Sequence, residues 1–176
     1  MKRDQYGFTL VEITAVLVLM AIIAAYVIGR SVATEQIDLA GQTDKIRTQI
    51  RYAQAMGMKR SDNNKIWGIK FDPTNDEYWL FSVDIPVVAN DEDLPINQVT
   101  FPGETNKKVS AAALNVDINP LAFNILFFDR FGRPYTQYVD IDDPANDDLE
   151  NPLTITLTGG GQDRTIRVIP ETGLAQ

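Results

Sequence analysis

Residues 8–28 read FTLVEITAVLVLMAIIAAYVI, a nearly continuous apolar run close to the start of the chain. As an α-helix this run would extend about 30 Å, the thickness of a bilayer core, because each residue adds about 1.5 Å. Lys2 and Arg3 precede it, and basic flanking residues favour the cytoplasmic side of a membrane. The run is therefore predicted to cross a membrane once, with the residues before it in the cytoplasm.

Glu12 is the one charged residue in this run. A carboxylate near the middle of a membrane costs about 2.5–3.5 kcal/mol on insertion scales, and less near an interface. From the residues alone, three interpretations are open. The run is a plain membrane anchor, a signal peptide that is removed by cleavage after Ser31-Val32-Ala33, or a helix that stays in the mature protein after a short leader before it is cleaved off. A signal peptide would leave a secreted binding or carbohydrate-active domain that begins near Thr34. Glu12 favours the third interpretation, because a helix that later leaves the lipid and meets a cationic partner gains an ion pair from the carboxylate. The competing explanation is that Glu12 merely lies at the level of the lipid headgroups.

The composition excludes several classes of function. The chain has 176 residues and a net charge of −8, with neither cysteine nor histidine. Ser-His-Asp triads, Cys-His pairs and the usual zinc and iron sites therefore cannot form. The remaining carboxylates are scattered along the sequence and suggest no other arrangement of catalytic residues, so the chain is predicted not to be an enzyme. Its acidic charge makes nucleic acid an improbable partner, because phosphates would be repelled.

An amphipathic stretch continues the apolar run beyond Gly29-Arg30, and one helix is predicted from Phe8 to about Arg60, about 80 Å long. Gly29 and Gly41 would be bends, points where the helix melts, or places where it crosses a neighbour. We divide the chain into residues 1–7, 8–29 as a membrane and filament-core helix, 30–60 as its continuation, and 61–176 as a β-rich head. The apolar stripe expected to dock on that head comprises Ile37, Ala40, Ile46, Ile50, Ala53 and Gly57.

Beyond Ser61 the pattern changes to short alternating segments separated by turn residues, which is typical of β-strands. The fold class is therefore α+β: a long N-terminal helix, transmembrane in its first half, packed on a small antiparallel β-sheet head. Trp67 and Trp79 are predicted to fill the core of the head, and a partner-binding patch is the other interpretation of this pair. Residues 123–128 are predicted to form the most buried strand. Strands are predicted at residues 66–71, 77–83, 123–128, 135–141, 153–158 and 164–169, with a polar loop at 86–108.

Residues 7–12 read GFTLVE and follow a short basic stretch. This junction closely resembles the leader junction of type IV prepilins and of type II secretion pseudopilins. The resemblance implies that a membrane-embedded prepilin peptidase cleaves after Gly7, with residues 1–7 as the leader, and that the new N-terminal Phe8 is N-methylated. It also implies that Glu12 pairs with the Phe8 amine of a neighbouring subunit. Such a pair would fix the axial register, because slippage would leave two buried charges uncompensated.

The head has a looser resemblance, carried by residues 51–61, by Phe131-Gly132-Arg133 and by residues 164–173. Their order is similar to that in H-type minor pseudopilins of type II secretion and in FimT-type minor pilins. The resemblance implies a subunit held in the inner membrane lipid with its head in the periplasm. An assembly platform in that membrane would add it, with other pilin-like subunits, to a periplasmic pseudopilus that helps drive protein export. The alternative is a minor type IV pilin for pilus assembly, adhesion or DNA uptake.

One acidic segment could bind calcium, because hard oxygen ligands are concentrated there. The spacing matches no defined calcium loop, so a solvated charged loop is the other interpretation. No other cofactor is expected. The candidate ligands are Asp140, Asp142, Asp143, Asp147 and Asp148, with Glu150 nearby.

Overall fold

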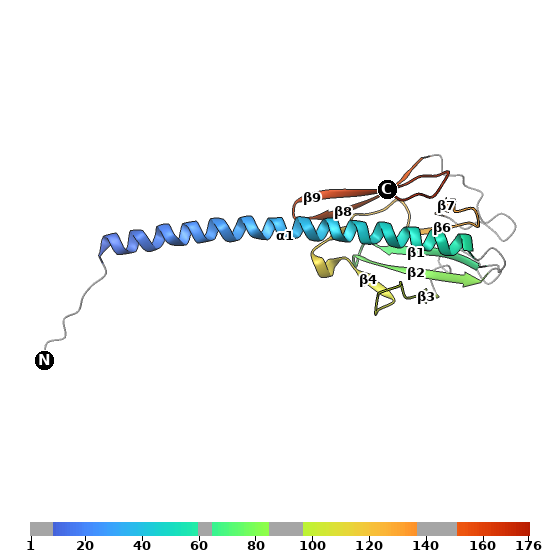
Figure 1. Cartoon of the computed structure of the whole chain (residues 1–176), viewed down its shortest axis with the longest axis horizontal. Coiled ribbons are helices and arrows are strands. Elements are labelled where there is room, and N and C mark those ends of the chain that lie inside the picture. The colour runs from blue at the N-terminus through green and yellow to red at the C-terminus, as the bar shows by residue number, and fades with distance from the viewer. Residues whose placement is uncertain (1–8, 60–64, 85–96, 137–150) are drawn as a thin grey trace.

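The computed structural model describes residues 9–59, 65–84, 97–136 and 151–176, and of residues 28–35 the backbone alone. A single helix, α1 (Leu10–Lys59), contains 50 residues and is about 75 Å long at about 1.5 Å per residue. Its N-terminal half projects from the molecule, and its C-terminal half lies along the β-strands (Figure 1). The expected α+β architecture, with an apolar N-terminal helix and an antiparallel sheet head, is confirmed.

Two antiparallel sheets form the head, which we define as the described residues from Lys65 to Gln176. The larger sheet has the order β3-β2-β1-β6-β7, and β4 pairs with the other end of β2. The smaller sheet has the order β5-β8-β9. The larger sheet comprises β1 (Lys65–Asp72), β2 (Glu77–Asp84), β3 (Gln98–Val99), β4 (Lys108–Ser110), β6 (Ile125–Phe128) and β7 (Pro134–Tyr135). The smaller comprises β5 (Asp117–Ile118), β8 (Leu153–Gly159) and β9 (Gln162–Val168), and a 3₁₀-helix, η2 (Ala112–Leu114), precedes it.

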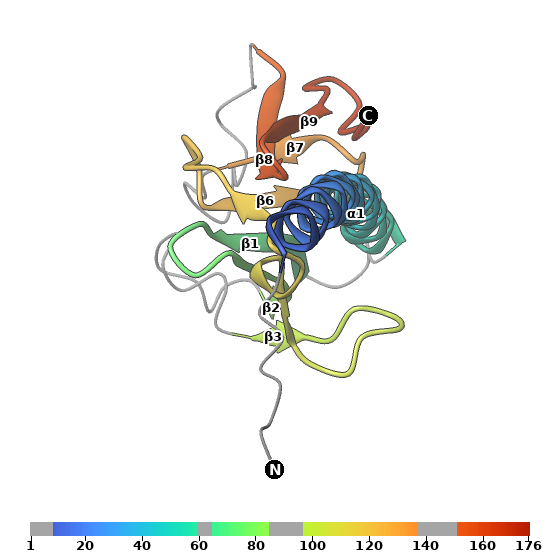
Figure 2. The ribbon, with the colours of Figure 1, turned by 90° about the vertical axis from the view of Figure 1, so that its left-hand side faces the viewer.

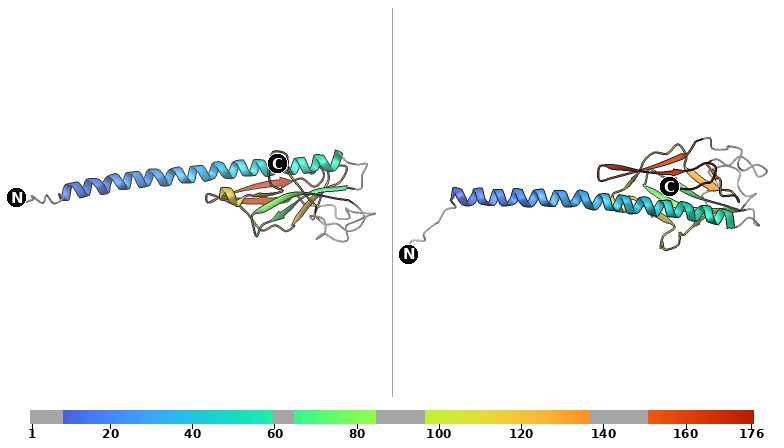
Figure 3. Two further views of the ribbon diagram at one scale, coloured as in Figure 1. Left: turned by 90° about the horizontal axis from the view of Figure 1, so that it is seen from below. Right: turned by 45° about the horizontal axis from the view of Figure 1, so that its top comes forward.

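The two sheets lie around one side of α1, as the view along the helix shows (Figure 2). The view from below places the strands on one side of the helix, beside its C-terminal half (Figure 3, left). Helix α1 contacts β1 and β6 of the larger sheet and β8 and β9 of the smaller one. The helix is therefore the element that joins the two sheets.

The main core lies between the stripe of α1 and the sheet faces beneath it. Ile46, Ile50 and Ala53 are fully buried there, as their spacing predicts. The prediction for Ile37 was wrong, because this side chain is 72% exposed. Ile37 precedes Ile46 by nine positions, which at about 100° per residue places it on the opposite side of the helix. Leu39 occupies the buried position instead, seven positions before Ile46.

Ala40, also assigned to the stripe, is half-buried at its margin, whereas Gly57 is buried as expected. A Cβ atom at Gly57 would come within 2.9 Å of the Phe128 carbonyl oxygen. Glycine at this position thus lets α1 approach β6 closely.

A second cluster covers the face of the larger sheet that points away from α1. Alternation along β1 and β2 divides the two tryptophans between the two faces. Trp67 belongs to the core under the helix and Trp79 to the opposite cluster, and both are buried as predicted. All four residues of β6 are buried, which agrees with the prediction of a strongly buried strand there, although the strand begins at Ile125.

Three expectations need adjustment. The predicted loop at 86–108 contains β3, which pairs with Leu80 and Phe81 of β2, and its last residue begins β4. Short edge strands of this kind depend on the partner strand and leave little local pattern in the sequence. The predicted strand at 135–141 coincides with β7 only at Tyr135; Thr136 lies in a bend, and residues 137–141 lie outside the described residues. Gly41 does not break the helix, which is continuous through it.

Candidate functional site

The projecting half of α1 begins with an almost wholly apolar segment. Within it, the window Leu10–Val27 has a mean hydropathy of 2.5 and is long and apolar enough to cross a membrane. None of this window is buried by the rest of the chain; Leu10 is 79% exposed and Tyr26 is 68% exposed. A helix that is hydrophobic all round is stable in water only when something covers it, either lipid or protein. The apolar window, as we call Leu10–Val27, therefore fits membrane anchoring.

Helix α1 begins with a local capping arrangement. The Glu12 backbone N–H donates to the Thr9 hydroxyl oxygen at 3.3 Å and to the Thr9 carbonyl oxygen at 3.0 Å. Thr9 thus satisfies a backbone donor that has no partner within the helix. Glu12 lies in the first turn, where the partial positive charge of the helix N-terminus favours a carboxylate. The Thr-x-x-Glu spacing accounts for where the helix starts.

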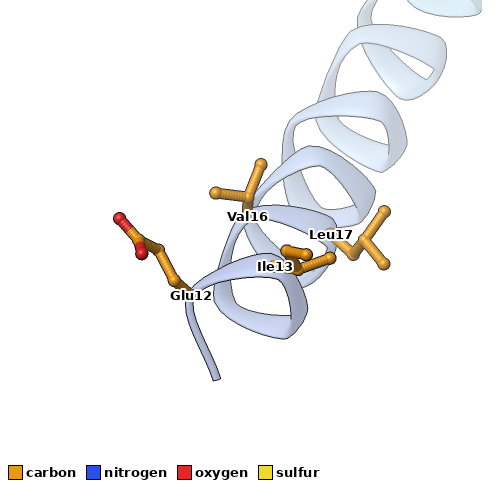
Figure 4. Close-up of a pocket in the computed structure, with 4 residues that line it drawn as sticks. All are labelled: Glu12, Ile13, Val16 and Leu17. Atoms are coloured by element: carbon orange, nitrogen blue, oxygen red, sulfur yellow. The ribbon is translucent and has the colours of Figure 1, made fainter. Parts of the chain in front are cut away.

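The Glu12 side chain is exposed beside a shallow apolar hollow on the helix surface. The hollow is lined by Glu12, Ile13, Val16 and Leu17, and it is open to the surroundings. In Figure 4 the carboxylate extends outward from the helix, clear of the three aliphatic side chains. A single carboxylate therefore stands at the end of an otherwise apolar rod, available to a cation on another molecule.

The other predicted site residues lie outside the described part of the chain. This applies to Gly7 and Phe8, and to the acidic segment at 140–150. Among the described residues, no group of three or more Asp and Glu side chains is arranged to hold a metal ion. Glu12 is thus the one proposed functional side chain that the described residues place.

Sequence reasoning missed the contacts that fasten α1 to the C-terminal end of the chain. The Arg51 guanidinium donates to the Ala175 carbonyl oxygen through both Nε, at 3.1 Å, and a terminal nitrogen, at 2.8 Å. The Gln54 amide donates to the carbonyl oxygens of Gly132, at 2.9 Å, and Thr172, at 2.6 Å. More than seventy positions separate the partners, so no local pattern in the sequence indicates them.

A polar seam between α1 and the loop after β3 was also not predicted. The Gln42 amide donates to the Tyr78 hydroxyl at 3.4 Å, and Lys45 forms an ion pair with Glu104 at 2.8 Å. The Gln49 amide donates to the same Glu104 carboxylate at 3.4 Å. Burial, and secondarily the negative charge of Glu104, raise the pKa of the Tyr78 phenol well above its ordinary value. The seam holds the helix over the sheet, although the buried side-chain oxygen of Gln49 has no hydrogen-bond partner among the described residues.

Comparison with known protein families gives one match. Residues 2–28 match the prokaryotic N-terminal methylation motif, a prepilin-type segment, and the match includes the GFTLVE stretch and the apolar window. Comparisons with curated proteins and with solved structures found no match. The N-terminal segment is therefore of the type IV pilin kind, which implies processing by a prepilin peptidase and assembly with other pilin subunits.

Proposed function

We propose that this chain is a structural subunit of a pilin-like filament, cleaved after Gly7 and methylated on Phe8. One observation carries the proposal: an uncovered apolar helix with a single carboxylate in its first turn projects from a folded head. Before assembly the apolar window would lie in the inner membrane, with the head in the periplasm. After assembly, the same surface would be covered by the helices of neighbouring subunits.

Glu12 would set the axial register of that filament. Cleavage creates an ammonium group at Phe8, one helical turn from Glu12. Within an apolar bundle, each charge alone would be costly, whereas the carboxylate of one subunit and the amine of the next compensate each other. The outward direction of the Glu12 side chain supports pairing with another molecule.

Within the pilin-like class, we propose a minor pseudopilin of a type II secretion system. Support comes from the order of the helix end, the Phe131-Gly132-Arg133 turn and the final hairpin, which resembles that of the H-type subunits. The minor type IV pilin named above is the alternative, and it shares the same N-terminal motif. Deleting the gene in its host and measuring protein secretion and surface pili separately would distinguish the two functions.

The processing step is tested by the intact mass of the protein purified from its host. The expected mature chain begins at Phe8 and carries one methyl group. Gly7→Ala should leave the full-length precursor in the membrane, because the peptidase acts after this residue in such leaders. A mature N-terminus near Thr34, or normal processing of the Gly7→Ala chain, would overturn the proposal.

The assembly role of Glu12 needs a variant that separates charge from folding. Glu12→Ala should insert into the membrane at least as well as the native chain, since a charge has been removed from an apolar segment. It should nevertheless fail to enter filaments. Thr14→Ala is the matched control, because Thr14 lies in the same turn and its hydroxyl bonds only within the helix, to the Val11 carbonyl oxygen at 2.9 Å. Equal incorporation of both variants would contradict the charge-pairing role.

A further inference from the structure

Three segments that are distant in the sequence meet near the C-terminal end of α1. They are the end of the helix itself, the turn at residues 129–133 after β6, and the segment at residues 170–174 after β9. The Gln54 amide joins them, because it donates to the carbonyl oxygens of both Gly132 and Thr172. A Cβ at Gly173 would overlap the Gly132 carbonyl oxygen, so the second and third segments are in direct contact.

Each of these segments exposes a large apolar side chain. Outside the apolar window, the described residues that do so are Ile37, Met58, Leu114, Phe131 and Leu174. Three of these, Met58, Phe131 and Leu174, belong to the segments that meet here. Met58 reaches the turn, since a Cβ at Gly132 would lie 2.9 Å from its sulfur atom. Exposed apolar side chains that gather on a folded surface mark an interaction site. We call Met58, Arg130, Phe131 and Leu174 the distal patch.

The turn at residues 129–133 holds the aromatic member of the patch in a fixed position. The Asp129 carboxylate accepts hydrogen bonds from the backbone N–H groups of Phe131 and Arg133, each at 2.8 Å, and from the Arg133 Nε at 2.9 Å. Gly132, with a φ of 82°, makes the left-handed step that closes the turn. Phe131 is nevertheless 63% exposed, so a well-ordered turn presents an aromatic ring that the described head does not cover.

The distal patch also has a cation available to a partner. The Arg130 guanidinium lies over the Phe131 ring, 4.7 Å from its centre, and forms no ion pair with a described residue. Arg133, by contrast, is paired with Asp129. Arginine and aromatic side chains are enriched at the centres of protein interfaces, and a guanidinium can bind a carboxylate through two parallel hydrogen bonds. The composition of the patch therefore suits an anionic partner that also has apolar side chains.

Distance and charge argue against a lipid surface or nucleic acid as that partner. Met58 lies about 46 Å beyond Val27 along the helix, at about 1.5 Å per residue, so a bilayer around the apolar window does not reach the patch. Any extended anionic surface would also be repelled by the net charge of −8. A short peptide segment has only to complement the patch itself, because charges farther away are screened. A second copy of this chain is disfavoured too, since the minor subunit proposed above would have few copies to pair.

We propose that the distal patch binds an acidic and apolar peptide segment of another protein. A carboxylate of that segment pairs with the Arg130 guanidinium, and a neighbouring aliphatic or aromatic side chain packs against Phe131 and Met58. Because the turn is already ordered, little entropy is lost on binding. The surface is separate from Glu12 and from the apolar window. The inference therefore goes beyond the proposed function and does not depend on it.

The test is a binding titration of the full chain in discs of zwitterionic lipid, with empty discs as the blank. The probe is a short fluorescent peptide composed of glutamate, leucine and serine. Two matched peptides replace every glutamate with glutamine, or every leucine with serine. We expect saturable binding of the first peptide, weakened by added salt because the ion pair lies at the surface. Binding of each matched peptide should be weaker by about fivefold or more.

Substitutions locate the binding on the chain. Arg130→Glu and Phe131→Ser should each weaken binding of the first peptide by about fivefold or more. Arg164→Glu is the control for charge, since Arg164 is an exposed arginine of β9, and Leu114→Ser is the control for an exposed apolar side chain. Each control should change the affinity by about twofold or less. All four positions are exposed, so an unchanged melting temperature shows that each variant is folded.

Several outcomes would overturn the proposal. One is equal affinity for the three peptides, and another is an equal loss of affinity in the patch and control variants. Vesicles of anionic lipid that bind the native chain but not Arg130→Glu, with no binding of the peptide, would assign the patch to a lipid surface instead. Self-association of the native chain that Phe131→Ser abolishes would assign it to a second copy. Filament incorporation is measured separately, and a failure of peptide binding leaves the proposed function intact, because every variant keeps Gly7, Phe8 and Glu12.

Discussion

At the scale of single residues, two glycines in the chain meet very different surroundings. A Cβ at Gly68 would lie 2.5 Å from the Leu126 carbonyl oxygen and 2.7 Å from the Phe127 Cβ, so β1 and β6 are too close for any side chain there. A Cβ at Gly41 would meet nothing within 4 Å. The two positions therefore predict opposite effects of the same substitution.

Gly68→Ala should lower the free energy of unfolding by about 1–3 kcal/mol or more, because neither backbone nor Cβ contacts can yield easily. Gly41→Ala should raise it by up to about 1 kcal/mol, the difference in helix propensity. Thermal melts of the full chain in detergent compare them. If the Gly41→Ala chain is stable but fails to enter filaments, Gly41 allows close packing against a neighbouring subunit. If the substitution destabilises the isolated chain, the space around Gly41 is not open as the structure shows it.

Tyr78 predicts a pH dependence. Because burial raises the pKa of its phenol above the ordinary value of about 10, the folded chain keeps a proton that the unfolded chain releases. This contribution to stability is complete below about pH 10, and above it the free energy of unfolding falls by about 1.4 kcal/mol per pH unit.

The melting temperature of Tyr78→Phe should therefore decline less between about pH 9 and 11 than that of the native chain. Tyr52→Phe is the control, since the Tyr52 side chain is only half-buried. Parallel pH curves for the native chain and Tyr78→Phe would show that the phenol ionises in the folded state as easily as in the unfolded one.

At the scale of elements, periodicity predicted the long helix and most of the longer strands. Ile46, Ile50 and Ala53 repeat at helical spacing, and the alternation in residues 164–168 indicates β9, because each pattern arises from one buried face. The short strands β3 and β5 were not predicted, since two residues carry no period and their pairing depends on a distant strand. The Glu12 position could be predicted from its motif, whereas the contacts of Arg51 and Gln54 could not.

The final residues of the chain act as an element that fastens the helix to the smaller sheet. Gln176 and Arg167 exchange backbone hydrogen bonds at 2.8 and 2.9 Å, which places the tail beside β9. The Arg51 guanidinium then binds the carbonyl oxygen of Ala175, a fully buried residue. The tail thus connects α1 and β9 through polar contacts.

Arg51→Met should lower the free energy of unfolding by about 1–3 kcal/mol, because it leaves the Ala175 carbonyl without its donor. Asp44→Ala is the control on the same helix: it removes the surface ion pair with Arg47 and should change stability by about 0.5 kcal/mol or less. Chemical denaturation of the full chain in detergent measures both. Equal effects would mean that the tail contact contributes no more than a surface ion pair.

At the scale of the whole molecule, one helix serves two environments. Its C-terminal half is amphipathic and helps to form the core of the head, whereas the apolar window contributes no residue to that core. Val18 and Ile37 are both exposed aliphatic residues of α1, at 59% and 72%, but Val18 lies in the middle of the apolar window and Ile37 lies beyond it. The exposed fraction alone does not show which of the two side chains would lie in a membrane. Their positions along the helix do, because only Val18 lies within the apolar window.

Val18→Arg should therefore impair membrane integration, at a cost of about 2.5–3.5 kcal/mol for a charge at the centre of a spanning helix. Ile37→Arg should leave integration unchanged, because its position is outside the window and its side chain points away from the core. Extraction of host membranes at alkaline pH measures the integrated fraction: most Val18→Arg chain is expected in the supernatant and most Ile37→Arg chain in the pellet. Loss of both from the membrane would mean that the spanning segment extends past Val27 toward the head. Retention of both would mean that the head or a partner, rather than the apolar window, holds the chain at the membrane.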